Sequence, residues 1–211
     1  VPDGVGKVIM TRSISRVQFT SLKSNFTAQY AGVTFKIDSI YLANVRNNAT
    51  VMGEEDTEAD YFRGGPVEFA VIQGLIDPEA NVNASFAKTY ETPLVLSSES
   101  GELDATALGF DKYINANQPE YAEEDGYLTR LLITGTLMDG DRELGKKYFH
   151  IPLKLVDDTG NVASNKFFKI SATITGEGSP NPDEILENAC INFSIEVAPW
   201  NVVEQTEEDT N

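Results

Sequence analysis

The sequence predicts an all-β protein of the antiparallel Greek-key β-sandwich class. Apolar and polar residues alternate in several stretches, which is the pattern of strands with one buried face. Turn-forming residues separate the later stretches, at 139–141 and 157–161. The loop at 176–182 is too long for a tight hairpin, so we expect the last strand to cross over, as in Greek-key sandwiches, and not to pair with its neighbour in sequence.

The first two expected strands each show a change of phase. The strand in residues 7–22 changes phase between Ile14 and Val17, which predicts a bulge or a short break there. The second strand, residues 33–42, changes phase at residues 38–39. We interpret this second position as the place where the strand twists or changes sheets.

The middle of the chain gives the weakest patterns. Residues 47–60 predict a loop, and their acidic run is interpreted as a solvated face. Residues 67–76 fit a short strand or a helix turn equally well, because so short a stretch has no decisive period. The polar composition continues to residue 126, with apolar anchors only at 93–96 and 107–110. We therefore expect a long irregular insert at 53–126.

Clear strand patterns return after residue 126. The stretches 127–138, 148–156 and 166–175 predict three strands that form an antiparallel meander. Pro152 lies on the outer phase and indicates an edge strand, because proline has no backbone donor. Two of these strands have matching apolar faces, which are Phe149, Ile151, Leu153 and Leu155 on one and Phe168, Ile170, Ala172 and Ile174 on the other.

The last strand, residues 190–198, alternates most regularly, with Ile191, Phe193, Ile195 and Val197 on its apolar face. Pro199 removes a backbone donor and ends ordinary ladder pairing. Apolar residues nevertheless continue beyond the proline before the chain becomes acidic. The candidate functional residues are the start of this tail: Pro199, Trp200, Asn201, Val202, Val203 and Glu204.

Composition argues against several classes of function. The chain has 33 acidic and 16 basic residues and a net charge of −17, which opposes binding to the phosphate backbone of nucleic acids. No apolar run reaches the length of a membrane-spanning helix. The single cysteine, Cys190, cannot form an internal disulfide and is interpreted as a small buried hydrophobe.

No group of residues indicates catalysis. His150, the only histidine, is out of phase with its apolar neighbours and is expected on the polar face, without a nucleophile or metal ligands at a recognisable spacing. The segment 139–141 lacks the glutamate that a calcium loop requires and is explained as a turn. We therefore expect no enzyme, no metal and no cofactor.

Both ends of the chain carry a family pattern. Its most specific part combines Ile-Thr-Gly-Glu-Gly at 174–178, an Asn-Pro loop, the alternating last strand and Trp200 with a short tail. The chain resembles the C-terminal half of the fimbrillins, the major and accessory pilins of Bacteroidales type V fimbriae. It departs from that family at Ser164-Asn165, where an Arg-Asn pair is usual, and residues 53–126 are unmatched. The matching stretches are 10–20, 35–44, 168–178 and 197–200.

The resemblance implies one transthyretin-like β-sandwich domain over 1–211, with the insert at 53–126 and the tail at 199–211. It also implies that the family's N-terminal domain is absent from this chain. The implied function is that of a non-enzymatic structural or accessory subunit of a cell-surface fimbria that contributes to adhesion. Family members are exported as lipoproteins and trimmed by a protease, so the implied location is extracellular and associated with the outer membrane.

The implied partners are other fimbrial subunits, joined when a strand of one subunit fills a groove in the next. Trp200, Val202 and Val203 are spaced to supply side chains for such a groove. The alternative is that the tail folds back on its own sandwich as a further edge strand. A second alternative, suggested by the long insert, is a surface adhesin that binds a host glycan or protein without polymerising.

Overall fold

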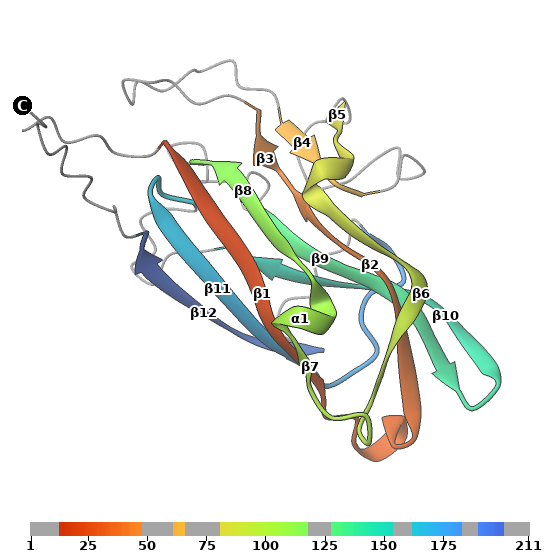
Figure 1. Cartoon of the computed structure of the whole chain (residues 1–211). Coiled ribbons are helices and arrows are strands. Elements are labelled where there is room, and N and C mark those ends of the chain that lie inside the picture. Colours follow the sequence, from red (N-terminus) through yellow and green to blue (C-terminus); the bar gives the residue numbers. More distant parts are fainter. Residues whose placement is uncertain are drawn as a thin grey trace, which may run out of the picture.

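A computed structural model of the chain describes residues 13–47, 61–65, 81–117, 128–153, 162–182 and 190–200. Strands dominate this part of the chain, and two sheets pack face to face as a sandwich (Figure 1). The predicted all-β class is therefore confirmed. The helical elements described are short: η1 (Ala28–Tyr30), η2 (Ala84–Phe86) and α1 (Ala105–Leu108).

Sheet A contains the C-terminal strand. Its order is β12-β11-β1, and β7 and β8 both pair with the far side of β1. The strands are β1 (Ile14–Ser24), β7 (Leu103–Asp104), β8 (Asp111–Asn115), β11 (Lys166–Ile174) and β12 (Ile191–Pro199). β1 and β11 run parallel, whereas β12 and β8 are antiparallel to their neighbours. Among the described residues, β12 is an edge of this sheet.

Sheet B is antiparallel throughout, in the order β10-β9-β2-β6. Its strands are β2 (Val33–Ala43), β6 (Ala87–Ser97), β9 (Arg130–Asp139) and β10 (Arg142–Pro152). A small third sheet joins β3 (Val45–Arg46), β4 (Tyr61–Arg63) and β5 (Asn81–Val82). In chain order the strands alternate between the two main sheets: β1 lies in sheet A, β2 and β6 in sheet B, β7 and β8 in sheet A, β9 and β10 in sheet B, and β11 and β12 in sheet A (Figure 1).

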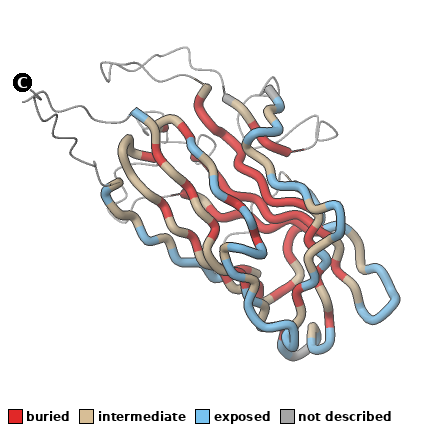
Figure 2. Tube along the Cα trace, viewed as in Figure 1, coloured by how far each residue is buried: buried red, intermediate tan, exposed pale blue. Residues whose placement is uncertain are grey.

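The core lies between sheets A and B. Phe35 of β2 and Phe149 of β10 meet edge to face within it, with ring centroids 5.2 Å apart. Burial is concentrated along β2 and β9, whereas β12 is mostly exposed or half-buried (Figure 2). The apolar faces predicted from alternation are confirmed where they are described; Leu155 lies outside the described residues. The confirmed residues are Phe149, Ile151, Leu153, Phe168, Ile170, Ala172 and Ile174.

The phase change in the second strand is confirmed in position and explained by a bulge. The register of β2 shifts between Ile37 and Ser39 against both of its neighbours. The extra residue returns Ile40 and Leu42 to the core face, and both are fully buried. The strand therefore stays in sheet B and does not change sheets.

The break expected between Ile14 and Val17 is wrong. β1 pairs with β8 without interruption over Ile14–Gln18, and its register shift against β11 lies between Phe19 and Ser21. Ile14 belongs to the outer face, so it is not evidence of a break. The bulge between Phe19 and Ser21 instead places Leu22 on the core face, where it is fully buried.

Two expectations about strand pairing are also wrong. The stretches expected as a meander divide between the sheets, because β9 and β10 form a hairpin in sheet B while β11 joins β1 in sheet A. The last strand does not cross over: β12 pairs directly with β11, from Ile191 opposite Ile174 to Pro199 opposite Lys166. Alternation defines the faces of a strand but not its neighbours, which explains both errors.

The insert expected at 53–126 is more regular than predicted. Its described part contains β6, an eleven-residue strand of sheet B, and β8, which pairs with β1. The anchor at 93–96 belongs to β6, where Leu96 is buried. The anchor at 107–110 begins in α1 with buried Leu108 and ends with buried Phe110, directly before β8. The term irregular therefore does not fit residues 81–117.

Candidate functional site

The C-terminal end of β12 carries the first two residues of the predicted tail. Pro199 closes the ladder opposite Lys166. Trp200 follows outside the strand, donates its backbone N–H to the carbonyl of Asn165 at 3.0 Å, and stacks its ring on Tyr113 of β8. The other candidate residues, Asn201, Val202, Val203 and Glu204, lie outside the described residues, so their role remains a prediction.

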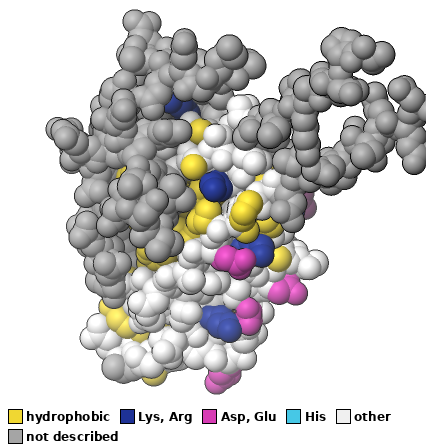
Figure 3. Space-filling model, turned by 90° about the vertical axis from the view of Figure 1, so that its left-hand side faces the viewer, with side chains coloured by type: hydrophobic (Ala, Val, Ile, Leu, Met, Phe, Trp, Pro, Cys, Tyr) yellow, Lys and Arg dark blue, Asp and Glu magenta, His cyan; other side chains and the backbone are white. Residues whose placement is uncertain are grey.

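The inner face of β12 is only partly covered by the opposite sheet. Ile191 is buried, but Phe193 is 36% exposed, and Ile195 and Val197 are half-buried at the margin of the core. Figure 3 faces the side of the molecule on which β12 lies, and hydrophobic side chains reach the surface there between basic and acidic ones. No described residue pairs with the outer edge of β12. Within the described part of the chain, the strand thus combines a backbone edge that pairs with no other strand and exposed apolar side chains.

The other edge of the sandwich on this side is protected. Pro152 ends β10, and its prediction as an edge-strand residue is confirmed. Tyr148 of β10 exchanges two backbone hydrogen bonds with Ser179, at 2.9 and 3.0 Å, so a loop residue covers part of the strand's edge. Buried Lys147 donates to Glu177 in the same loop. β10 is therefore a poorer acceptor for an added strand than β12.

Cys190 precedes β12 and is half-buried, not fully buried as expected. Its Sγ lies 3.1 Å from the position that a Cβ on Gly176 would occupy. The glycine therefore allows the loop after β11 to approach the start of β12. In this position the cysteine packs as a small apolar side chain at the margin of the core.

The outer face of sheet A is polar and locally balanced in charge. A hydrogen bond to Asp111 raises the pKa of Arg16, whereas hydrogen bonds from Ser21 and Lys23 lower the pKa of Glu102. Each acidic side chain in these pairs is thus neutralised by a basic one, although the chain as a whole is strongly acidic. The pairs are Arg16–Asp111 at 2.5 Å, Lys23–Glu102 at 3.0 Å and Lys169–Glu196 at 3.1 Å.

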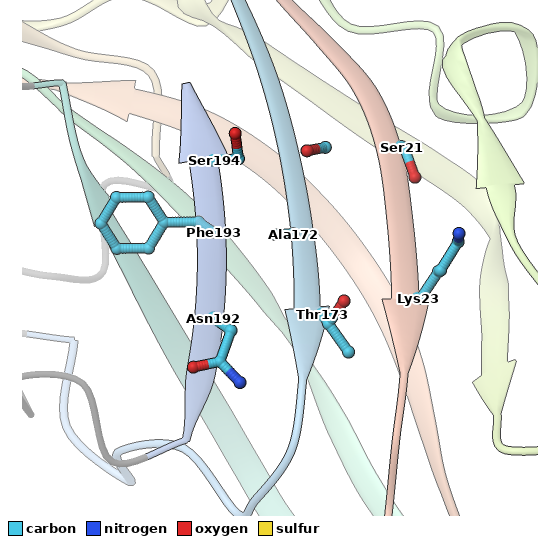
Figure 4. A pocket seen from close by; sticks show the side chains of 8 residues that line it. Ser21, Lys23, Ala172, Thr173, Asn192, Phe193 and Ser194 are labelled. Carbon is cyan, nitrogen blue, oxygen red and sulfur yellow. The ribbon is translucent and has the colours of Figure 1, made fainter. Parts of the chain in front are cut away.

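A shallow hollow of about 300 Å³ lies on β1, β11 and β12 (Figure 4). It arises because two successive rows across the strands carry small or narrow polar side chains: Ser21, Ser171 and Ser194 in one row, and Lys23, Thr173 and Asn192 in the other. Phe193 projects away from these groups in Figure 4. The hollow therefore offers hydroxyl, amide and ammonium groups to a ligand.

His150 lies on the outer face of sheet B, as its phase predicts, but it is buried, which the sequence did not predict. Burial, together with the positive charge of Arg130, lowers the pKa of His150 to about 4. The imidazole is therefore neutral at physiological pH. In the part of the chain that the structure describes, no three His, Cys, Asp or Glu side chains gather as metal ligands, and no helix has the length and apolarity of a membrane span.

Comparison with known proteins gives matches among solved structures. Neither protein-family models nor curated proteins match the sequence. A fimbrilin from Porphyromonas gingivalis W83 superimposes with a TM-score of 0.69 over 92% of this chain, at 20% identity. The chain has the fold of a fimbrilin. Its resemblance to fimbrillin-like domains, predicted from the two ends of the sequence, is thereby confirmed at the level of fold.

Two further structures share this fimbrilin fold. Both come from Parabacteroides distasonis ATCC 8503 and are named as candidate cell adhesion proteins. They have TM-scores of 0.61 and 0.62 at 18% identity, over 90% and 93% of this chain. The chain spans 60% of the length of the fimbrilin, and 60% and 54% of the two others.

The sequence predicted the end of β12 as a candidate site but did not predict Tyr113, on which Trp200 stacks. Tyr113 lies in the insert, where no strand was predicted, and nothing in its neighbourhood indicates an aromatic partner. The polar hollow was predictable only in part: the alternation of the last strand places Asn192 and Ser194 on its polar face. The missing information was that β1 and β11 lie beside it in register.

Proposed function

We propose that this chain is part of a non-enzymatic structural or accessory subunit of a cell-surface fimbria, which assembles by strand exchange and contributes to adhesion. One observation carries the proposal: among the described residues β12 is an edge strand with partly exposed Phe193, Ile195 and Val197, and the apolar tail follows this strand directly in the sequence. The fold shared with a fimbrilin supports it.

In this proposal the partners are other fimbrial subunits. The chain has a candidate acceptor for a partner's strand and a candidate donor segment of its own. An extended segment can add to the open edge of β12 through backbone hydrogen bonds, while alternate side chains cover its apolar row. The segment Pro199–Glu204 supplies Trp200 and Val202 on one face of such an extended segment and Val203 on the other. The subunit is extracellular and reaches the outer membrane through a lipoprotein precursor.

Deletion of residues 200–211 from the complete protein tests the donor role of the tail. We expect loss of fibres in electron micrographs, while the thermal unfolding of the domain stays close to that of the wild type. A deletion that begins at Gln205 is the matched control, because it retains the apolar residues and should still form fibres. Unchanged fibres after the longer deletion would contradict the donor role.

The hollow on the outer face of sheet A favours a second candidate function, a surface module that binds neutral glycans. Its polar side chains both donate and accept hydrogen bonds, as sugar hydroxyls require, and the neighbouring ion pairs leave no excess charge to attract an acidic ligand. The chain applied to an array of neutral and acidic oligosaccharides should bind neutral ones, and Ser171→Trp, which fills the hollow, should remove the signal. No reproducible binding, or binding that survives this substitution, would exclude the hollow as the site.

A further inference from the structure

The tryptophan at the end of β12 reaches across sheet A. Its ring stacks on Tyr113, with ring centroids 5.4 Å apart and the planes inclined by 19°. Tyr113 belongs to β8, so β11 and β1 lie between the two strands that carry the stacked rings. With about 4.8 Å between neighbouring strands, the chain end spans roughly 14 Å of the sheet.

A line of backbone hydrogen bonds supports this crossing. Trp200 donates to the carbonyl of Asn165 at 3.0 Å, and Asn165 donates to the carbonyl of Ile14 at 3.1 Å. Asn165 has a left-handed backbone, with φ of 57°, which asparagine tolerates better than most residues. The turn before β11 thus links the end of β12 to the start of β1.

The contact lies beyond the part of β12 that is buried in the core. Ile191 at the beginning of the strand is buried, but the residues toward Pro199 are exposed or half-buried. Trp200 is half-buried and Tyr113 is 52% exposed, so the stacked pair is open to solvent on one side. Stacked aromatic pairs and single amide hydrogen bonds each contribute modestly to stability, and such a contact can therefore open while the sandwich stays folded.

We propose that the stack of Trp200 on Tyr113 is a latch, which holds the end of β12 on its own sandwich and sets how often the following segment is available to another subunit. This proposal rests on the proposed function for its consequence in assembly. The latch itself belongs to the single chain and is measurable without any partner. Tyr113 is a positioning residue in this account, because it acts through Trp200.

The chain offers a direct probe, because Trp200 is its only tryptophan. Tyr113→Ala removes the ring on which Trp200 rests, and Tyr113→Phe retains a ring and is the matched control. In the alanine variant we expect a red-shifted tryptophan emission and stronger quenching by acrylamide. Hydrogen exchange of the Trp200 amide should be about two- to tenfold faster, as expected for the loss of one aromatic pair. The phenylalanine variant should match the wild type in all three signals.

The same variants in the complete protein test the consequence for assembly. We expect Tyr113→Ala to form fibres about two- to tenfold faster than the wild type and Tyr113→Phe to form them at the wild-type rate. Trp200 signals that do not respond to Tyr113→Ala would overturn the latch, and so would an exposed Trp200 with an unchanged fibre rate. Failure of the proposed function has a different signature: fibres then persist after deletion of residues 200–211, whatever the state of Trp200.

Discussion

Lys147 and Glu177 show how a single buried charge is held in this sandwich. The lysine is 5% exposed, and its ammonium group donates to Glu177, which also accepts a hydrogen bond from the hydroxyl of Tyr30 at 3.3 Å. The bond from Lys147 is the main reason why the pKa of Glu177 lies below its ordinary value. The ion pair joins β10 to the loop that protects its edge.

We expect Glu177→Gln to destabilise the fold by about 1–3 kcal/mol, because it leaves the buried ammonium group without its charged partner. Glu196→Gln is the matched control, since it removes a carboxylate from an exposed pair with Lys169 and should cost less than about 1 kcal/mol. Urea denaturation of both variants measures the difference. Equal losses would show that burial of Lys147 does not strengthen its pair.

His150 predicts a specific dependence of stability on pH. Its pKa is about 4 in the folded chain, because of burial and the charge of Arg130, and 6.5 in the unfolded chain. The unfolded chain therefore takes up a proton first as the pH falls. Stability is fully present above pH 6.5 and decreases toward pH 4, by about 3 kcal/mol in total from this residue.

Urea denaturation of the wild type and of His150→Gln between pH 7 and pH 4 isolates this effect. The other titrating groups are common to both proteins, so the loss of stability should be smaller in the variant by the contribution of His150. Parallel curves for the two proteins would mean that the imidazole is protonated at its ordinary pKa in the folded chain. The sequence predicted the outer phase of this residue but not its burial, which depends on contacts beyond the strand itself.

Among the elements, β2 depends most clearly on a distant residue. Its bulge at Asp38 brings the carbonyl of Lys36 to 2.2 Å from the position that a Cβ on Gly135 of β9 would occupy. The carbonyl carbon of Lys36 and the Cα of Ile37 lie 2.9 Å from the same position, and all three atoms belong to the backbone of a central strand, which cannot shift without disturbing its pairing. A glycine is therefore required where β9 passes the bulge.

We expect Gly135→Ala to destabilise the fold by about 1–3 kcal/mol or more, because the added methyl group overlaps the backbone of β2. Gly140→Ala in the turn between β9 and β10 has open space around its Cβ and a φ of 58°, so its cost comes from backbone strain and should be near 1 kcal/mol. Thermal unfolding of the two variants compares these costs. A well-tolerated Gly135→Ala would show that sheet B relaxes around the bulge.

The sequence predicted which face of each strand is buried better than it predicted which strands pair with one another. Alternation identified the core residues of β10 and β11, since the inner face of a strand is visible in its own residues. It did not reveal that β1 lies parallel to β11, because residues at the two ends of the chain meet there. β6 and β8 were missed for another reason: they bury few side chains, so their apolar pattern is weak.

At the scale of the whole molecule, the edge strands of the sandwich differ in how well they are protected against pairing with another chain. β10 is covered by Ser179 and ends at Pro152, and β6 carries Lys88, Glu91 and Pro93, all of which oppose pairing with another chain. β12 has partly exposed apolar residues on one face and a largely uncharged polar face on the other. The strong negative charge of the chain favours solubility, so the association proposed through β12 would have to come from a local fit between the surfaces.

The most direct test of this account compares two glutamates placed on opposite faces of β12 in the complete protein. Phe193→Glu puts a charge in the exposed apolar row, and Ser194→Glu puts the same charge on the polar face one residue away. With both variants folded by circular dichroism, we expect Phe193→Glu to abolish fibres and Ser194→Glu to leave them unchanged. Fibres at the wild-type level from Phe193→Glu would contradict the role of the β12 edge in assembly.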